Sequence, residues 1–354
     1  MKFVRAIGSL GLYLRVGLLL FLTGLIFPGS GLGAATSEND ATAKLIEGAK
    51  KEGQVVWYTS IGLEDGNEIL KRFHEKYPFI NVKMYRTGSE NMLTRVLAEA
   101  KAGKQLWDVI CTAGVESLII QKKGLLAKYQ SPHRPYYAEG FKDREGYWTD
   151  LYVTLNVVGY NVRLVPPKEI PRAWEDLLHP RWKGKMGMDT KAFEWFGSMV
   201  KIMGEEKGLD YMKRLAEQNI TFRTGRVVTS QLMAAGELAI GITQHNQRIE
   251  EMKKRGAPIE WVALDPVIPE IHPMMIYARA PHPNAARLFV DYLLSREGQT
   301  VVASFYRIPS RRDVEPIIPG MTKGLKILPY DTSIADNYEK IVQQYRKIFL
   351  NVAR

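Results

Sequence analysis

Hydrophobic positions in the first third of the chain alternate between strand-like runs and helical spacing. Apolar runs predict buried strands at 54–59, 80–84 and 108–111. Apolar residues at helical intervals predict helices at 45–52, 65–77, 89–100 and 116–124, with Ser89 as the cap of the third. This alternation predicts parallel strands joined by right-handed crossovers, and therefore an α/β fold.

The rhythm changes at 147–161, where two strand-like runs, 151–155 and 157–160, follow each other without a helix between them. We interpret this stretch as a crossing from one lobe to a second. Strands are predicted in the second lobe at 186–188, 221–223, 238–242 and 259–264, and helices at 194–206, 208–218, 228–235 and 248–255.

The chain is expected to return to the first lobe through 267–279, a proline-interrupted and then apolar stretch. Amphipathic helices at 284–294 and 297–305 should pack on that lobe, and 331–354 should close the fold with a helix. The predicted domain division places 36–151 and 275–354 in lobe one and 152–274 in lobe two.

The N-terminus has the order of a secretory signal peptide, which we assign to residues 1–35. Lys2, Arg5 and Arg15 precede an apolar run at 16–27, and small residues follow as far as Ala35. A membrane anchor is the alternative, but this run has about a dozen residues and a spanning helix needs about 20. The sequence therefore predicts export to the periplasm, with cleavage after Ala34 or Ala35.

Composition narrows the class of protein without naming a function. The 354 residues are 45% hydrophobic and 25% charged, which is typical of a globular protein and, at this length, of two domains. Cys111 is the only cysteine, so no internal disulfide can form. The signal carries three basic and no acidic residues, and its removal lowers the net charge from +11 to +8. Basic and acidic residues are interspersed and no nucleic-acid-binding motif accompanies them, so no nucleic-acid partner is expected.

Small polar residues and glycines recur where the predicted strands turn into helices. Backbone N–H groups and the positive end of the helix dipole favour an anion or a polar oxygen at such turns. Each turn alone is equally well explained as an ordinary helix cap. Their repetition across two lobes favours a ligand cleft, with these candidate binding residues: Ser60, Thr87, Gly88, Ser89, Thr112, Thr190, Arg226, Gln244, His245 and Asn246.

Catalytic and metal-binding motifs are not found in the sequence. There is no phosphate-binding loop of the Walker type, no Gly-x-Ser-x-Gly elbow and no His-Glu-x-x-His. The six histidines show no metal-ligand spacing, and Cys111 has no evident histidine partner. We therefore expect no catalytic residues, no resident metal and no cofactor, and a protein that is not an enzyme.

Several short motifs, in this order and spacing, resemble the extracellular solute-binding proteins of ABC importers, of the two-lobed type that includes the ferric-iron-binding proteins. The motifs are Trp57-Tyr58-Thr59-Ser60, Tyr85-Arg86-Thr87-Gly88-Ser89, Trp107-Asp108-Val109, Trp174-Glu175-Asp176-Leu177, Trp182-Lys183-Gly184-Lys185 and Ser295-Arg296-Glu297-Gly298-Gln299. The resemblance implies two α/β lobes that close over a ligand, and an inner-membrane ABC permease as the partner. We expect the receptor to be a monomer.

The resemblance leaves the ligand open. Ferric members hold iron with adjacent tyrosines just after the strand at 238–242, where this chain has Gln244, His245, Asn246 and Gln247. The basic turns favour a small anionic or polar organic solute. A ferric-iron receptor using His245 with Tyr58 or Tyr152 is one alternative, and a secreted enzyme on the same fold is another.

Overall fold

The computed structural model describes residues 32–104 and 106–350. The chain divides into two compact units, Met1–Thr42 and Ala43–Arg354. The sheet, its covering helices and the cavities described below all lie in the second unit. Most of the expected signal peptide, residues 1–31, lies outside the described residues. In the described part of the chain, no helix combines the length and apolarity needed to cross a membrane.

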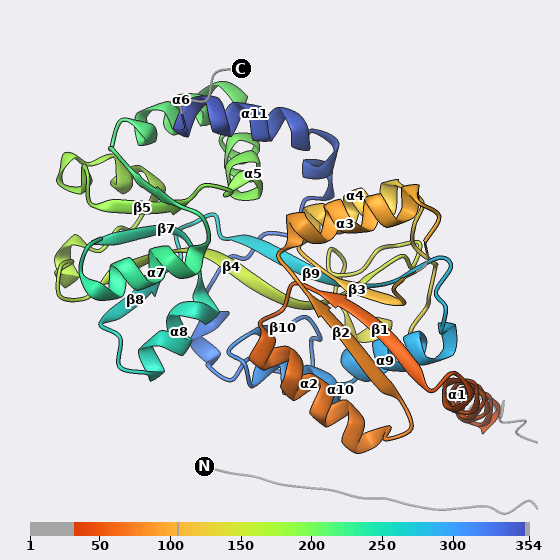
Figure 1. The fold of residues 1–354 in the computed structure, drawn as a ribbon. Coiled ribbons are helices and arrows are strands. Elements are labelled where there is room, and N and C mark those ends of the chain that lie inside the picture. Colours follow the sequence, from red (N-terminus) through yellow and green to blue (C-terminus); the bar gives the residue numbers. More distant parts are fainter. Residues whose placement is uncertain (1–31, 105, 351–354) are drawn as a thin grey trace, which may run out of the picture. The chain divides into compact units, whose positions relative to one another are not determined.

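One mixed sheet runs through the second unit in the strand order β2-β1-β3-β9-β4-β7-β5-β6 (Figure 1). Strands β1–β3 pair in parallel at one end, and β5–β7 pair in parallel at the other. The strands are β1 Gln54–Thr59, β2 Asn81–Arg86, β3 Val109–Cys111, β4 Thr149–Asn161, β5 Met186–Asp189, β6 Thr221–Arg223, β7 Ile240–His245, β8 Ile259–Val262, β9 Ile268–Ile276 and β10 Ile308–Pro309.

Helices cover the two ends of this sheet, so the α/β prediction with two lobes is confirmed. The first lobe contains β1–β3 with α2, α3, α4, α9 and α10, and the second contains β5–β8 with α5–α8 and α11. The helices are α1 Leu32–Glu52, α2 Leu63–Lys76, α3 Ser89–Lys101, α4 Gly114–Lys122, α5 Phe193–Met203, α6 Glu205–Ala216, α7 Arg226–Ala235, α8 Asn246–Lys254, α9 Pro283–Leu294, α10 Arg296–Ala303 and α11 Tyr338–Phe349.

The β4 and β9 strands connect the lobes, as Figure 1 shows. They pair antiparallel with each other. On its other side, β9 pairs with β3 of the first lobe, and β4 pairs with β7 of the second. The prediction of two separate strands at 151–155 and 157–160 is wrong, because β4 is one strand of 13 residues, all buried. Asn156 does not interrupt it, since its Nδ2 donates to the Ile268 carbonyl of β9 at 3.4 Å.

The predicted cap of α3 is also corrected. Ser89 is the first residue of the helix, Gly88 occupies the cap position, and no side chain caps the helix. Ser89 Oγ instead accepts a hydrogen bond from the Ala113 N–H at 3.3 Å. The serine therefore links the starts of α3 and α4.

The C-terminal helix was expected on the first lobe, whereas α11 packs against α5 and α6 of the second. Tyr345 is fully buried there, and its hydroxyl donates to the Asp189 carbonyl at 2.6 Å. Phe349 packs against Phe196 and Tyr345. The chain thus passes between the lobes a third time before it ends. In contrast, α9 and α10 pack on the first lobe as predicted.

Loss of the Tyr345 ring should destabilise the second lobe. Tyr345→Ala removes a fully buried aromatic side chain, and truncations of this type cost about 3–5 kcal/mol. The free energy of unfolding in urea measures the effect. The exposed Lys347 of the same helix provides the control, and Lys347→Ala should change stability by less than about 0.5 kcal/mol. Equal effects of the two substitutions would contradict the packing role of α11.

Candidate functional site

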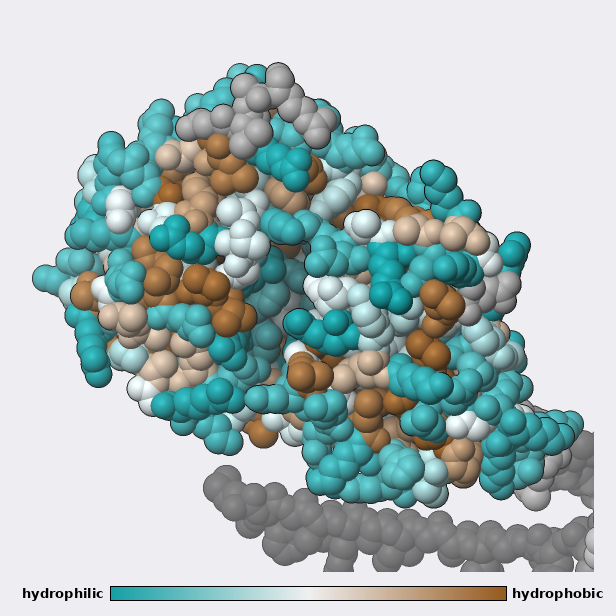
Figure 2. All heavy atoms as spheres, viewed as in Figure 1, coloured by the Kyte–Doolittle hydropathy of each residue, from teal (hydrophilic) through white to brown (hydrophobic). Residues whose placement is uncertain are grey.

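A cavity of about 390 Å³ lies where the helices of both lobes begin. Its wall includes the N-terminal residues of α3 and α4 from the first lobe and of α5 and α7 from the second, together with one residue of β9, Glu270. Figure 2 shows this face of the molecule hollowed between the two lobes, with both hydrophilic and hydrophobic residues around the hollow. The first N–H groups of each helix have no partner within the helix, so several free donors surround this space.

Four of the ten candidate binding residues lie on the cavity wall, namely Gly88, Ser89, Arg226 and His245. Gly225 positions Arg226, because its φ of 94° belongs to a backbone region that glycine enters without strain. The Arg226 Nε donates to the Thr243 carbonyl at 2.8 Å, which directs the guanidinium toward β9. His245 ends β7 and precedes α8.

The other candidates are not on this wall. Thr112 is fully buried, Ser60 and Thr87 continue the first-lobe sheet through backbone hydrogen bonds, and the Thr190 hydroxyl lies 3.3 Å from that of Thr224. Gln244 and Asn246 are both fully buried.

A bulge in β7 explains the positions of Gln244 and Asn246. The register between β4 and β7 shifts by one residue, and Thr243 takes a left-handed φ of 58°, which is unusual for a β-branched residue. The Gln244 side chain is thereby turned into the second lobe, where its Oε1 accepts from Ser230 Oγ at 2.6 Å. Asn246 Oδ1 accepts from the Leu155 N–H of β4 at 3.1 Å. Only His245 of this polar run faces the cavity.

Glu270 is the residue that sequence reasoning missed at the centre of the site. Its Oε2 lies 3.3 Å from Arg226 Nη2 and 3.2 Å from His245 Nε2. Burial alone would raise the pKa of Glu270, but the Arg226 charge and the hydrogen bond with His245 outweigh it and hold the pKa well below its usual range. The sequence did carry a signal for this residue, because Glu270 and His272 are the two ionisable residues in the otherwise apolar stretch 268–276.

Both histidines beside Glu270 are held neutral. Burial lowers the pKa of His245, and the nearby Arg226 charge lowers it further. Burial lowers the pKa of His272 to about 3, although Glu270 acts in the opposite direction. His272 lies behind the cavity wall and stacks on Tyr152 with ring centroids 4.1 Å apart.

Two further carboxylates, Glu116 of α4 and Glu194 of α5, also line the cavity. Burial raises the pKa of Glu116 to about 7. Burial likewise raises the pKa of Glu194 well above its usual range, and the charges of Glu270 and Glu116 add to the shift. Nearer the mouth, Lys191 pairs with Glu90, which connects the second lobe to the start of α3. The cavity therefore has both basic and acidic parts.

The residues that the ferric alternative requires do not share this cavity. Tyr58 is buried, and its hydroxyl donates to Glu99 Oε1 at 3.0 Å. Tyr152 is buried under His272 and Arg307. Within 32–104 and 106–350, no group of three or more His, Cys, Asp or Glu side chains has the geometry to hold a metal ion.

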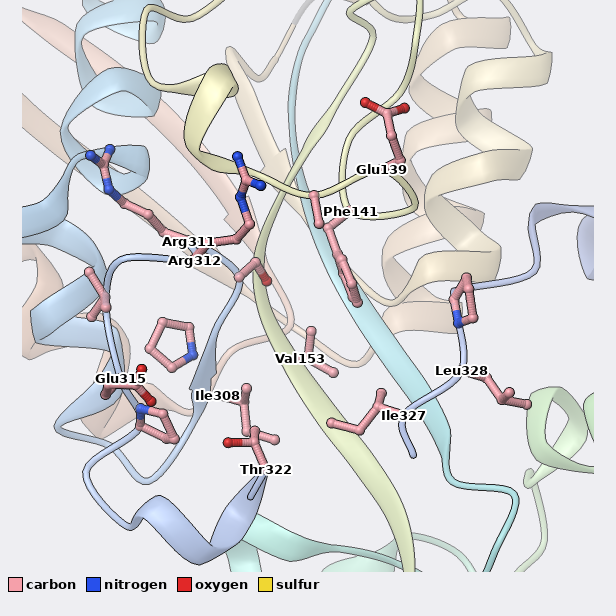
Figure 3. A pocket seen from close by; sticks show the side chains of 16 residues that line it. Glu139, Phe141, Val153, Ile308, Arg311, Arg312, Glu315, Thr322, Ile327 and Leu328 are labelled. Atoms are coloured by element: carbon pink, nitrogen blue, oxygen red, sulfur yellow. The ribbon is translucent and has the colours of Figure 1, made fainter. Parts of the chain in front are cut away.

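A second cavity, of about 320 Å³, lies beside β10 in the first lobe (Figure 3). Its labelled lining includes Phe141, Val153, Ile308 and Ile327, with Arg311 at the edge. The Arg311 guanidinium is already paired with Asp313 at 2.6 Å. Since binding sites for polar solutes need polar groups that converge on the ligand, the first cavity is the better candidate.

Two α/β lobes joined by crossing strands, with a polar cavity between their helix N-termini, define the class of two-lobed solute-binding receptors. The chain belongs to the family described as bacterial extracellular solute-binding protein, whose sequence profile matches residues 106–330.

Similar proteins include receptors with different ligands. A putative 2-aminoethylphosphonate-binding periplasmic protein of Salmonella typhimurium is 25% identical over 285 residues, covering 75% of this chain and 81% of the relative. An Fe(3+)-binding periplasmic protein of Serratia marcescens is 20% identical over 236 residues, covering 63% and 68%. The structure of AfuA from Actinobacillus pleuropneumoniae with fructose-6-phosphate has a TM-score of 0.74 at 25% identity, covering 85% of this chain and 99% of AfuA.

His272 should make the protein less stable in acid. The pKa of His272 is lowered, so its contribution to stability is complete above about pH 6.5 and is lost as the pH falls toward 3. One such proton contributes a slope of about 1.4 kcal/mol per pH unit. In His272→Phe, which retains a ring against Tyr152, the unfolding free energy should fall less steeply between these pH values. The exposed His74 gives the control, and His74→Gln should retain the wild-type slope. An unchanged slope in His272→Phe would contradict the assignment.

Proposed function

We propose that the protein is a periplasmic receptor that captures a small polar organic solute with an anionic group and delivers it to an ABC permease of the inner membrane. The family assignment supports solute binding, and the periplasmic location of the relatives supports the compartment. The observation that carries the ligand class is the convergence of helix N-termini from both lobes, with Arg226 between them, on one cavity.

The anionic group belongs at the starts of α3 and α7. Free N–H groups and helix dipoles favour negative charge there, and Arg86, Lys191 and Arg226 add three basic side chains on the same wall. Arg226 is most enclosed, because Glu270 and the Thr243 carbonyl hold its guanidinium in place. A planar guanidinium fixed in this way binds a phosphonate, phosphate or carboxylate through paired hydrogen bonds.

The position of the cavity between the two lobes also suggests how the receptor closes over its ligand. The walls belong to different lobes, and β4 and β9 connect those lobes, so bending of these strands would open and close the cavity. The exposed Lys191–Glu90 ion pair spans the mouth and contributes at most about 1 kcal/mol by itself. The ligand therefore has to supply most of the free energy that keeps the receptor closed.

Binding should depend on Arg226 and not on its neighbour Arg223. Titration calorimetry with 2-aminoethylphosphonate, fructose 6-phosphate and inorganic phosphate tests the class of ligand. Arg226→Gln should weaken binding of the preferred anion by about 10- to 100-fold, because a charged hydrogen-bonding partner is lost. The exposed Arg223, at the end of β6, serves as the matched control, and Arg223→Gln should bind normally.

Solution scattering with and without that ligand should show a more compact receptor when it is bound. Identical profiles under saturating ligand, or normal binding by Arg226→Gln, would contradict the proposal. The ferric alternative has its own signal, since a visible charge-transfer band after addition of ferric iron would favour an iron receptor.

A further inference from the structure

The cavity wall has more acidic side chains than its ion pairs account for. Glu270 is paired with Arg226, and Glu90 with Lys191. Asp189 Oδ1 is occupied by the N–H groups of Lys191 and Gly225. Among the described residues, Glu194 Oε1 has no hydrogen-bond partner, and the Glu116 carboxylate is hydrogen-bonded to its own backbone N–H but to no basic side chain. Two acidic side chains of the cavity wall are therefore left without an ion-pair partner.

Helix capping does not account for these two carboxylates. Acidic residues in the first turn of a helix are common, because the helix dipole stabilises their charge. Such residues are usually solvated, whereas Glu116 is only 6% exposed and Glu194 Oε1 is buried. A buried carboxylate without a basic partner costs more free energy than a helix dipole offsets.

The two carboxylates come from different lobes. Glu116 lies on α4 and Glu194 on α5, so closure brings two like charges toward each other and toward Glu270. Protons or a bound cation can relieve this repulsion. Two aromatic residues of the same wall, Phe193 and Tyr338, have ring centroids 6.2 Å apart. Carboxylates combined with aromatic faces are a favourable environment for an organic ammonium group.

We propose that the solute is a zwitterion whose protonated amine is held by Glu116 and Glu194, while its phosphonate, phosphate or carboxylate group lies at the starts of α3 and α7. This inference rests on the proposed function and adds the cationic end of the ligand. The basic and acidic parts of one cavity then match the two ends of one small molecule.

The ammonium group of the ligand replaces the proton that neutralises the Glu116 carboxylate in the empty receptor. In the empty receptor, the raised pKa of about 7 for Glu116 leaves a carboxyl proton on part of the population at neutral pH. When the ammonium group binds, the carboxyl group releases this proton to solvent and the carboxylate pairs with the N–H groups of the ligand. Binding of a zwitterion therefore releases the Glu116 proton, whereas binding of an anion without an amine leaves that proton in place.

Two ligands of matched size test the proposal in the full protein. 2-Aminoethylphosphonate and propylphosphonate differ by an ammonium in place of a methyl group, and fructose 6-phosphate supplies hydroxyl groups instead. In calorimetry at pH 7, 2-aminoethylphosphonate should bind about 10- to 100-fold more tightly than propylphosphonate. Proton release on binding of 2-aminoethylphosphonate, measured from the dependence of the binding enthalpy on the ionisation enthalpy of the buffer, should be larger in the wild type than in Glu116→Gln, in which only the phosphonate can ionise.

Replacing each carboxylate by an uncharged amide tests which residues bind the amine. Glu116→Gln and Glu194→Gln should each reduce the preference for the amine while retaining propylphosphonate binding, which also shows that the variants are folded. Glu64, at the start of α2, has a side chain that is 91% exposed, and Glu64→Gln should behave as wild type. A preference for the amine and a proton release equal to those of the wild type in both cavity variants would overturn the assignment of these residues.

The remaining outcomes separate this inference from the proposed function. Equal or tighter binding of propylphosphonate or fructose 6-phosphate, still dependent on Arg226, would overturn the zwitterion and leave the anion receptor standing. Absence of binding by all three compounds would overturn both.

Discussion

The antiparallel pairing of β4 with β9 is the constraint on which both the fold and the site depend. These two strands lie between the two parallel parts of the one sheet, so each lobe is built against the same central pair. All 13 residues of β4 and all nine of β9 are buried, which makes the connection between the lobes part of the core. A polar residue in these strands must find a partner inside the protein, and this requirement shapes the cavity.

Glu270 shows how this requirement is met. A carboxylate in a buried strand is costly unless it is paired, and Arg226 of α7 and His245 of β7 provide the partners. The pairing fixes the guanidinium at the cavity wall, while burial and the Arg226 charge lower the pKa of His245 and keep the imidazole neutral. The structural solution for one buried charge thus positions the basic part of the site, while Glu116 and Glu194 remain available to a ligand.

The fold could be predicted from the sequence to a considerable extent, because hydrophobic periodicity is a local property of the chain. Most helices and strands were found, and so were the parallel order of β1–β3 and the membership of the solute-binding family. The errors occur where long-range contacts override local pattern. Asn156 resembles a break in β4 until its hydrogen bond to β9 is known. The apolar face of α11 was recognised, but the lobe that it covers was not.

The sequence by itself determined which segments form strands and helices, and that polar turns and a few arginines gather at helix starts. It could not determine which of those polar residues face the solute. Gln244 and Asn246 are adjacent to His245 in the chain, yet the bulge at Thr243 turns both into the core. Glu116, Glu194 and Glu270 are far apart in sequence and meet only because two lobes close on one central pair of strands. Periodicity reports the face on which a side chain lies, whereas partners and burial are set by contacts between distant segments, and these decide the chemistry of the cavity.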